Sequence, residues 1–376
     1  MPPKLKLLLF TDWFSPAFKA GGPVRSVVNL VDRFKEEYDM FVFTSDRDLN
    51  DTNPFDDIVA DEWIARDGIH IYYYSPGKMS YALVKSTISD IAPDKIYLNS
   101  MFSNMILPIR AAYQSGKIVL APRGMLRPSA LAVKPIRKFF YLSLLKLFSV
   151  ERSITFHSTG VDETKNIKRI FPLATKIIEA PNLPVPVSGS LVEHLKEVGA
   201  VKLIFVGRIH PIKNLLVLLE ALEKVKGDIH LTIIATLEDL TYWEKCNVKI
   251  QALQEQIQIN VMIDLPHHEI KQHIEQAHFF VLPTEGENFG HAIFEALAVG
   301  CPIIISDQTP WRNLASQKAG FDLSLQDLNS FSNAIQSCID MDNDVWQEYR
   351  HGAWNEAKRY SAEMNPELSY FQLFNT

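Results

Sequence analysis

Short apolar runs alternate with longer amphipathic stretches along this chain, and the alternation occurs in both halves. The first half has runs at 5–11, 38–45, 69–74, 95–98 and 118–121. The second half has runs at 202–206, 229–234, 257–263, 279–282 and 302–306. Strands that alternate with helices form parallel sheets covered on both faces. Each half is therefore predicted to be a doubly wound α/β domain.

The segment APNLPVPVSGS, residues 180–190, separates the two halves. Its prolines and small residues favour an extended linker over a helix or a central strand. The chain has 376 residues, whereas one hydrophobic core usually serves no more than about 250–300. We therefore predict an N-terminal domain over 1–182 and a C-terminal domain over 183–350.

Composition narrows the functional classes and the compartment. The net charge of −6 argues against a protein that binds nucleic acid mainly through phosphate contacts. The three cysteines have no spacing typical of zinc sites or disulfide frameworks, which favours a reducing compartment. The first ten residues carry no small-residue cleavage site, and no apolar run reaches the ~20 residues of a membrane span. We expect a cytoplasmic protein whose membrane contact, if present, is peripheral.

A glycine pair follows the first predicted strand. Gly21 and Gly22 end a loop, Pro23 suits a first helical position, and the apolar residues from Val24 to Phe34 share one helical face. A glycine turn at the carboxyl end of the first strand lets the backbone approach an anionic ligand.

Two cations lie close to a predicted helix start in FVGRIHPIKNLLVLLEAL, residues 205–222. The first strand of the second half is expected to end at Val206, with a tight turn at Gly207. Arg208 and Lys213 then precede a leucine-rich helix, whose dipole favours anions at that end. The pair makes sense if a phosphate lies between the two side chains. The simpler interpretation is two solvated cations on a loop.

Two acids mark the start of another apolar helix in PTEGENFGHAIFEALAVGCPIIIS, residues 283–306. Glu287 precedes this helix and Glu295 lies in its second turn, while the backbone N–H groups of 288–290 can meet ligand oxygens. Carboxylates at these places suit the hydroxyls of ribose or a sugar. A helix-dipole partner and a solvated helix face are the simpler alternatives.

Together, Gly21-Gly22, GRIHPIKN at 207–214 and EGENFGHAIFEALAVGCPII at 285–304 resemble the retaining glycosyltransferases of family 4. The resemblance covers nearly the whole chain and is strongest over 203–311. It implies the GT-B fold, in which two Rossmann-like doubly wound parallel-sheet domains face a central cleft. It also implies that helices over 351–376 return to the N-terminal domain, with Pro366 breaking them, and that the domains close over the donor.

The resemblance assigns roles residue by residue. Arg208 and Lys213 would hold the diphosphate of a nucleotide sugar, Glu287 would contact the donor sugar, and Glu295 would bind the ribose. The remaining donor contacts would come from the backbone at Asn288, Phe289 and Gly290, and from Gly21 and Gly22. No metal and no cofactor would be needed, because the cations and helix amides offset the charge of the leaving group.

The chain departs from the family pattern in two places. Where many relatives carry a histidine facing the donor sugar, this sequence reads APRGML with Arg123, so Arg123 becomes a candidate donor contact. The usual Asn-Gly turn entering the second domain reads Asn182-Leu183-Pro184. His157, after another apolar run, is either a structural hydrogen-bond partner or an active-site residue.

Other features bear on the acceptor. The APRGM and TPW elements resemble members that build cell-surface polysaccharides such as lipopolysaccharide, which suggests a glycan or lipid-linked acceptor. The segment KPIRKFFYLSLLKLF, residues 134–148, interleaves basic with aromatic and aliphatic residues. Such a helix can lie on an anionic bilayer at the inner face of the membrane. Alternatively, its apolar face packs on the sheet of the N-terminal domain.

The leading hypothesis is a retaining hexosyltransferase that uses a nucleotide-diphosphate sugar. Three alternatives stay open at this point: a nucleotide-sugar epimerase with the same fold, a phosphorylase, and a non-catalytic partner that binds nucleotide sugars. The donor sugar, the base of the nucleotide and the linkage depend on pocket contacts that spacing does not reveal.

Overall fold

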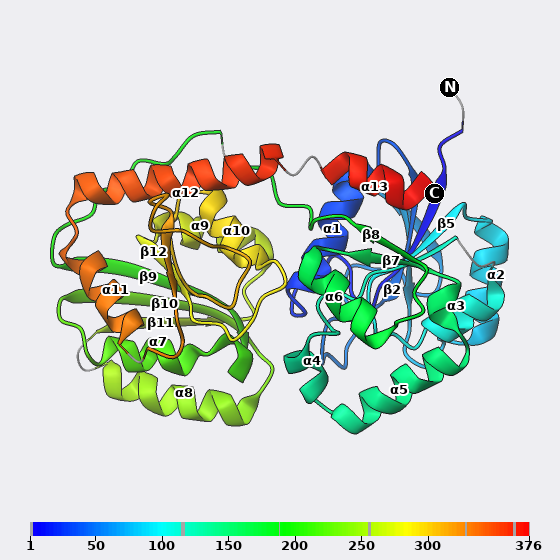
Figure 1. The fold of residues 1–376 in the computed structure, drawn as a ribbon, viewed down its shortest axis with the longest axis horizontal. Coiled ribbons are helices and arrows are strands. Elements are labelled where there is room, and N and C mark those ends of the chain that lie inside the picture. Colours follow the sequence, from blue (N-terminus) through cyan, green and yellow to red (C-terminus); the bar gives the residue numbers. More distant parts are fainter. Residues whose placement is uncertain are drawn as a thin grey trace. The chain divides into compact units, whose positions relative to one another are not determined.

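The computed structural model describes residues 3–113, 117–187, 189–254, 257–327, 329–363 and 366–375. Its contacts divide the chain into two compact units, Met1–Leu183 with Asn365–Thr376, and Pro184–Met364 (Figure 1). Each unit is built on one largely parallel sheet with helices on its faces. This confirms the predicted fold class of two parallel-sheet α/β domains.

The N-terminal unit contains an eight-stranded sheet in the order β3-β4-β2-β1-β5-β6-β7-β8. Only β3 runs antiparallel to its neighbour; the other described pairs are parallel. The strands are β1 Lys6–Phe10, β2 Asp39–Ser45, β3 Trp63–Arg66, β4 Ile69–Tyr74, β5 Lys95–Leu98, β6 Ile118–Leu120, β7 Thr155–Ser158 and β8 Lys176–Glu179.

Helices cover both faces of this sheet, so successive residues of a strand enter different cores. Leu8 and Phe10 of β1 belong to one apolar cluster, whereas Leu7 and Leu9 belong to the other. The helices are α1 Gly22–Phe34, α2 Tyr81–Ile91, α3 Ile106–Ala112, α4 Pro128–Ala132, α5 Pro135–Leu147, α6 Val161–Ile170 and α13 Pro366–Asn375, with a 3-10 turn η1 at Val150–Arg152. Helix α1 starts at the predicted glycine pair. Most residues of its predicted apolar face are buried, including Val24.

The C-terminal unit contains a six-stranded parallel sheet in the order β11-β10-β9-β12-β13-β14. The strands are β9 Ala200–Ile209, β10 Asp228–Leu237, β11 Gln258–Ile263, β12 Phe279–Leu282, β13 Ile303–Ser306 and β14 Gly320–Leu323. The helices are α7 Leu215–Leu222, α8 Leu240–Leu253, α9 His267–Gln276, α10 His291–Ala298, α11 Ser330–Asp340 and α12 Asn343–Glu363, with a 3-10 turn η2 at Pro211–Lys213. One apolar cluster fills this unit.

Two details differ from the sequence-based expectations. Strand β9 does not end at Val206 but continues to Ile209, because Gly207 and Arg208 pair with Ala235 and Thr236 of β10. The prediction of a tight turn at Gly207 was therefore wrong. At the other end of the chain, α12 continues through residue 351 to Glu363 and lies in the C-terminal unit, so within 351–376 only α13 joins the N-terminal unit.

Both sheets have a topological switch point beside their first strand. In the N-terminal unit β1 lies between β2 and β5, and in the C-terminal unit β9 lies between β10 and β12. Doubly wound sheets bind ligands at the carboxyl ends of the strands next to such a point. The predicted Gly21-Gly22 turn follows β1, and the predicted phosphate-binding residues lie at the end of β9.

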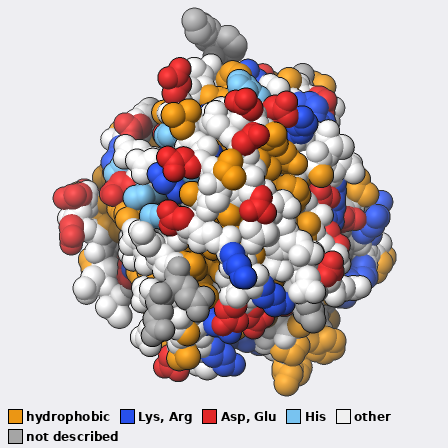
Figure 2. Space-filling view, turned by 90° about the vertical axis from the view of Figure 1, so that its left-hand side faces the viewer, with side chains coloured by type: hydrophobic (Ala, Val, Ile, Leu, Met, Phe, Trp, Pro, Cys, Tyr) orange, Lys and Arg blue, Asp and Glu red, His pale blue; other side chains and the backbone are white. Residues whose placement is uncertain are grey.

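No helix in the described ranges is both long enough and apolar enough to cross a bilayer. On the face presented in Figure 2, acidic and basic side chains are intermixed among polar and apolar ones. That face carries no continuous basic area of the kind that binds a phosphate backbone.

Candidate functional site

The loops that follow β9 and β12 are joined at the switch point of the C-terminal unit. Thr284 donates its side-chain hydroxyl to the backbone oxygen of Ile212 at 2.9 Å, and the N–H of Glu285 donates to the same oxygen at 2.8 Å. The turn η2 is closed by His210, whose Nδ1 accepts from the N–H of Ile212 at 3.1 Å. These bonds fix the backbone of both loops beside the switch point.

Lys213 and Glu287 form an ion pair between these two loops, from Nζ to Oε1. Their side chains keep exposed fractions of 16% and 12%. A β-carbon on Gly207 would lie 3.7 Å from Cγ of Lys213, so the strand passes close behind the lysine stem. The carboxylate oxygen shows that an anionic oxygen fits against Nζ, which is the contact that a phosphate would make.

Arg208 lies at the end of β9 and turns toward the end of β10. One of its terminal nitrogens donates to Oε2 of Glu238 at 2.6 Å, and the two side chains are 33% and 29% exposed. A pair this exposed contributes little to stability. Arg208 is therefore available for an anion at small cost.

Glu295, in the second turn of α10, meets a histidine that the sequence analysis did not select. His267 Nε2 lies 2.9 Å from Oε1 of Glu295, and His267 is the first residue of α9. The residues are 28 positions apart, and only the fold brings them together. Glu238 was missed as well, because the predicted strand ended at Ile234 whereas β10 continues to Leu237.

The TPW element, residues 309–311, holds the loop before α10 in place. Trp311 is buried and donates its indole N–H to the backbone oxygen of Phe289 at 2.7 Å. The N–H of Glu287 donates to the oxygen of Gln308 at 3.1 Å. The ring of Phe289 is itself buried, so any donor contact there falls to its backbone, as the resemblance implied.

Gly290 precedes α10 with a φ of 79°, in the left-handed region that favours glycine. A β-carbon there would also lie 2.7 Å from Cδ1 of Ile293. The backbone conformation and the space both favour glycine at this position. Asn288 lies in the same short loop, between Glu287 and Phe289.

In the N-terminal unit, Gly21 has a φ of 65° and Gly22 begins α1. The loop that leads to them is held by Asp48, whose carboxylate accepts from the N–H groups of Phe18 at 2.6 Å and Lys19 at 3.0 Å. The backbone that leads into the Gly21-Gly22 turn is therefore held in place. Its predicted role toward a phosphate stays a prediction.

Arg123 and His157 belong to one hydrogen-bonded network inside the N-terminal unit. Arg123 donates to Asn99, Asn182 and Tyr97, and Tyr97 contacts His157. Burial lowers the pKa of His157 to about 3, so this ring is neutral at physiological pH. Of the two open interpretations of His157, the buried hydrogen-bond partner is the one that this geometry favours.

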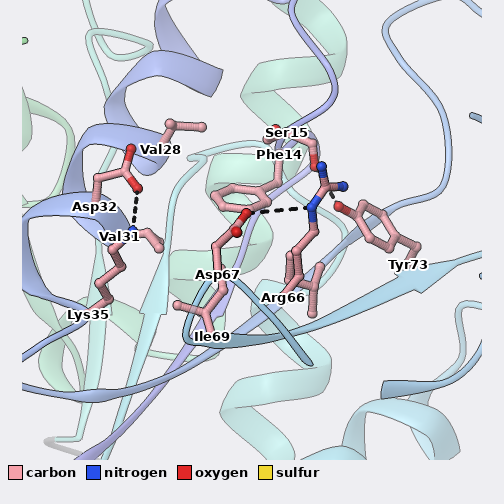
Figure 3. Close-up of a pocket in the computed structure, with 11 residues that line it drawn as sticks. Phe14, Ser15, Val28, Val31, Asp32, Lys35, Arg66, Asp67, Ile69 and Tyr73 are labelled. Atoms are coloured by element: carbon pink, nitrogen blue, oxygen red, sulfur yellow. Dashed lines mark hydrogen bonds and ion pairs between the residues drawn. The ribbon is translucent and has the colours of Figure 1, made fainter. Parts of the chain in front are cut away.

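A hollow of about 200 Å³ lies elsewhere in the N-terminal unit, between α1 and β4 (Figure 3). Its floor is apolar, with Phe14, Ile71 and Tyr73, and its rim carries the ion pairs Lys35–Asp32 and Arg66–Asp67. It contains none of the residues selected from the sequence. Among the described residues no group of three or more His, Cys, Asp or Glu side chains could hold a metal ion.

The C-terminal unit matches a known family. Residues 190–358 match the model of the family described as glycosyl transferases group 1. The match covers most of the C-terminal unit. Arg208, Lys213, Glu287 and Glu295 all lie within it, and the chain is a glycosyltransferase. None of the curated proteins compared with this sequence matches it significantly.

Solved structures extend the likeness to the whole glycosyltransferase. Anabaena HepE in complex with UDP and glucose superposes with a TM-score of 0.68 at 14% identity, over 98% of both chains. WaaG, described as a glycosyltransferase involved in lipopolysaccharide biosynthesis, gives 0.68 at 10% identity over 97% of this chain and 98% of that one. Sucrose-phosphate synthase from Thermosynechococcus elongatus gives 0.70 at 17% identity, over 98% and 97%. At these identities the likeness establishes the fold of both units.

Proposed function

We propose that this glycosyltransferase moves a hexose-type sugar, with retention of configuration, from a nucleotide-diphosphate sugar to a glycan or lipid-linked acceptor of a cell-surface polysaccharide. The observation that carries the proposal is the Lys213–Glu287 pair at the switch point of the C-terminal unit. It places a cation and a carboxylate side by side where a doubly wound sheet binds its ligand.

Lys213 and Arg208 offset the charge of the departing diphosphate. Both flank the carboxyl end of β9, and each now contacts one carboxylate oxygen. When a donor binds, phosphate oxygens take the places of those carboxylate oxygens. Charge that develops as the glycosidic bond breaks then meets two fixed cations, which is electrostatic stabilisation of the transition state.

Glu287 and Glu295 bind the two polyol parts of the donor. Glu287, released from Lys213, accepts hydrogen bonds from the hydroxyls of the sugar, while Glu295 accepts from the ribose. His267 keeps one oxygen of Glu295 in place at 2.9 Å. The N–H groups of Asn288, Phe289 and Gly290 are assigned to the sugar and the adjacent phosphate.

The reaction is proposed to need no metal, since the protein supplies the positive charge. Incubation with EDTA, followed by transfer assays with and without added Mg²⁺ or Mn²⁺, tests this directly. Equal rates support the proposal, and a rate that returns only with metal contradicts it.

We also propose a peripheral membrane contact through α5. Six of its apolar side chains are 39–77% exposed and share a face by helical spacing: Ile136, Phe139, Phe140, Leu144, Leu147 and, at its end, Phe148. Leu142 and Leu145, on the opposite face, are buried. The packing alternative thus accounts for one side of the helix only, and basic residues border the exposed side.

Vesicle flotation tests the membrane contact. Anionic vesicles should carry the wild type and lose Phe139→Ser/Phe140→Ser, because burial of these rings drives insertion. The double variant Leu240→Ser/Val248→Ser is the matched control, since both residues are exposed on α8 of the other unit. Equal flotation of all three proteins would remove α5 from the proposal.

Anomeric NMR of the transfer reaction tests the proposed chemistry. UDP-glucose is the first donor to try, since HepE has been solved in complex with it. We expect an α-configured product or slow α-configured hydrolysis, both lost in Lys213→Ala and kept in Lys245→Ala, an exposed lysine of α8. A β-configured product would overturn retention, and unchanged activity of Lys213→Ala would overturn the site.

A further inference from the structure

Arg123 lies in the loop after β6, and its guanidinium is surrounded by polar groups of the N-terminal unit. Nε donates to Oδ1 of Asn99 at 2.8 Å, and the two terminal nitrogens donate to Oδ1 of Asn182 at 2.5 Å and to the hydroxyl of Tyr97 at 2.6 Å. All three nitrogens of the planar fork thus have a partner within this unit.

The contact with Tyr97 fixes the tautomer of His157. The hydroxyl of Tyr97 accepts from Arg123, so it donates to Nδ1 of His157 at 2.8 Å. Nε2 of His157 therefore carries the ring proton and donates to the backbone oxygen of Ala180 at 2.8 Å. A directed chain of hydrogen bonds runs from Arg123 to Ala180.

These hydrogen bonds end at Ala180, just before Leu183, where the polypeptide leaves the N-terminal unit. His157 holds Ala180, Arg123 holds Asn182, and Asn29 of α1 donates to the oxygen of Leu183 at 2.8 Å. Three side chains from three different parts of the unit thus bind three of the four residues from Ala180 to Leu183. We call residues 180–183 the exit segment.

The returning end of the chain meets the same network. Tyr370 of α13 packs edge-on against His157 with ring centroids 5.3 Å apart. Burial alone would lower the pKa of Arg123, but Tyr97, Tyr370 and Glu163 outweigh it and the pKa is raised. The cation is retained by its surroundings.

The network also reaches the glycine turn. Asn99, which accepts from Arg123, donates its amide to the backbone oxygen of Pro23 at 3.2 Å. Pro23 directly follows Gly21 and Gly22 in the first turn of α1. One guanidinium therefore connects the exit segment with the turn that is expected to approach the phosphate.

We propose that Arg123 is a positioning residue that fixes the exit segment relative to the Gly21-Gly22 turn, and that it does not contact the transferred sugar. This rests on the proposed function, in which that turn approaches the diphosphate of the donor. It revises the assignment of Arg123 as a donor contact, since each of its three guanidinium nitrogens already donates to a partner inside the unit.

Two variants separate the roles. Arg123→Lys keeps the charge but loses the fork, and Asn182→Ala removes one of the three partners of that fork. In both we expect amide hydrogen exchange of the exit segment and of the first turn of α1 to rise by about tenfold, because these backbone groups lose their tether. Asn166→Ala on α6 is the matched control, since its side chain donates to the backbone oxygen of Asp162 in the same helix, and it should leave these amides unchanged.

Calorimetric binding of UDP and UDP-glucose supplies the second readout. A positioning residue changes both affinities by the same factor in Arg123→Lys, and Asn182→Ala reproduces the change. A sugar contact instead weakens UDP-glucose about tenfold more than UDP, only in Arg123→Lys, with exchange rates as in wild type. That second pattern would overturn the inference.

The exchange measurement needs no ligand, so the two proposals can fail separately. If neither nucleotide binds the wild type, the donor assignment is in question while exchange still decides the role of Arg123. If the wild type binds both and Arg123→Lys leaves the exchange of residues 22–26 and 180–183 unchanged, the positioning role is wrong.

Discussion

The two switch points of this glycosyltransferase share a topology and differ in their chemistry. In the C-terminal unit, the loops beside β9 are joined by the ion pair of Lys213 and Glu287, whose side chains are 16% and 12% exposed. In the N-terminal unit, the segments beside β1 are joined by the neutral contact from Asn99 to the oxygen of Pro23. The nearby cation, Arg123, donates its hydrogen bonds to partners in its own unit.

The difference separates recognition of a charged ligand from maintenance of a scaffold. The Arg208–Glu238 pair is about one-third exposed and adds little to folding, so Arg208 can exchange a carboxylate for a phosphate at small cost. Lys213 is less exposed, and it exchanges one anionic oxygen for another. A buried network is costly to break, because each lost partner leaves a desolvated group unsatisfied. The comparison supports the proposal that Lys213 and Arg208 at the C-terminal switch point bind the diphosphate, and that Arg123 at the N-terminal one positions the turn that approaches it.

The largest expected effect comes from Lys213→Ala. Loss of a cation that stabilises the leaving group should lower kcat/KM about 10²–10³-fold, by analogy with other preorganised electrostatic contacts. Steady-state transfer rates measure the loss, with Lys245→Ala as control. A decrease of less than about threefold would break the comparison, since the C-terminal switch point would then hold a merely structural pair.

Acid should weaken the N-terminal unit through His157. Its pKa is about 3 in the folded unit, against about 6.5 when unfolded, so below pH 6.5 only the unfolded state gains the proton. The free energy of unfolding should fall by about 2 kcal/mol between pH 6.5 and pH 5.

Native-state hydrogen exchange of the β7 amides measures this fall. In His157→Gln the contribution should be absent. His278 of the C-terminal unit, with a pKa lowered by burial to about 4, provides the parallel case. His157→Gln should leave the acid response of β12 unchanged, and a change there would show that the two units do not respond separately.

Gly290→Ala should disturb the donor loop more than the fold. The left-handed φ costs a side chain about 1–2 kcal/mol, and Ile293 must also move. We expect the KM for the donor to rise about tenfold with little loss of far-UV circular dichroism signal. Unchanged KM would indicate that the loop before α10 does not contact the donor.

The smallest effect is expected for Glu238→Gln. The ion pair with Arg208 is exposed, so the free energy of unfolding should change by no more than about 0.5 kcal/mol. Affinity for a nucleotide diphosphate should hold or rise, because Arg208 loses a competing anion. Chemical denaturation and calorimetry check the two parts, and weaker binding would show that Glu238 orients Arg208.

The sequence predicted the strands correctly where an apolar run is bounded by turn-forming residues. Runs 69–74 and 279–282 coincide with β4 and β12. Strand β3, at the sheet edge, is half exposed and lacks an apolar run, and β14 begins at a glycine, so both were missed. The pattern within α12 indicates a helix but does not reveal which unit it packs against.

The candidate site could be predicted only in part, because spacing along one loop says nothing about partners on another. Glu287 was selected from its place before α10, yet its contact with Lys213 joins residues 74 positions apart. His267 is a polar residue at an ordinary helix start and gave no signal. Arg123 was selected by analogy, and only its three hydrogen bonds reveal that it faces inward.

The most direct test is a thermal-shift titration of the purified protein with UDP, GDP, ADP and their sugar conjugates, alongside Lys213→Ala, Glu295→Ala and Lys245→Ala. A ligand at 100 times its dissociation constant should stabilise the wild type by about 2.7 kcal/mol. The account predicts a response to one nucleotide family that Lys245→Ala keeps and the other two variants lose. A response of equal size in all four proteins would contradict it, because the nucleotide would then bind away from the Lys213–Glu287 pair.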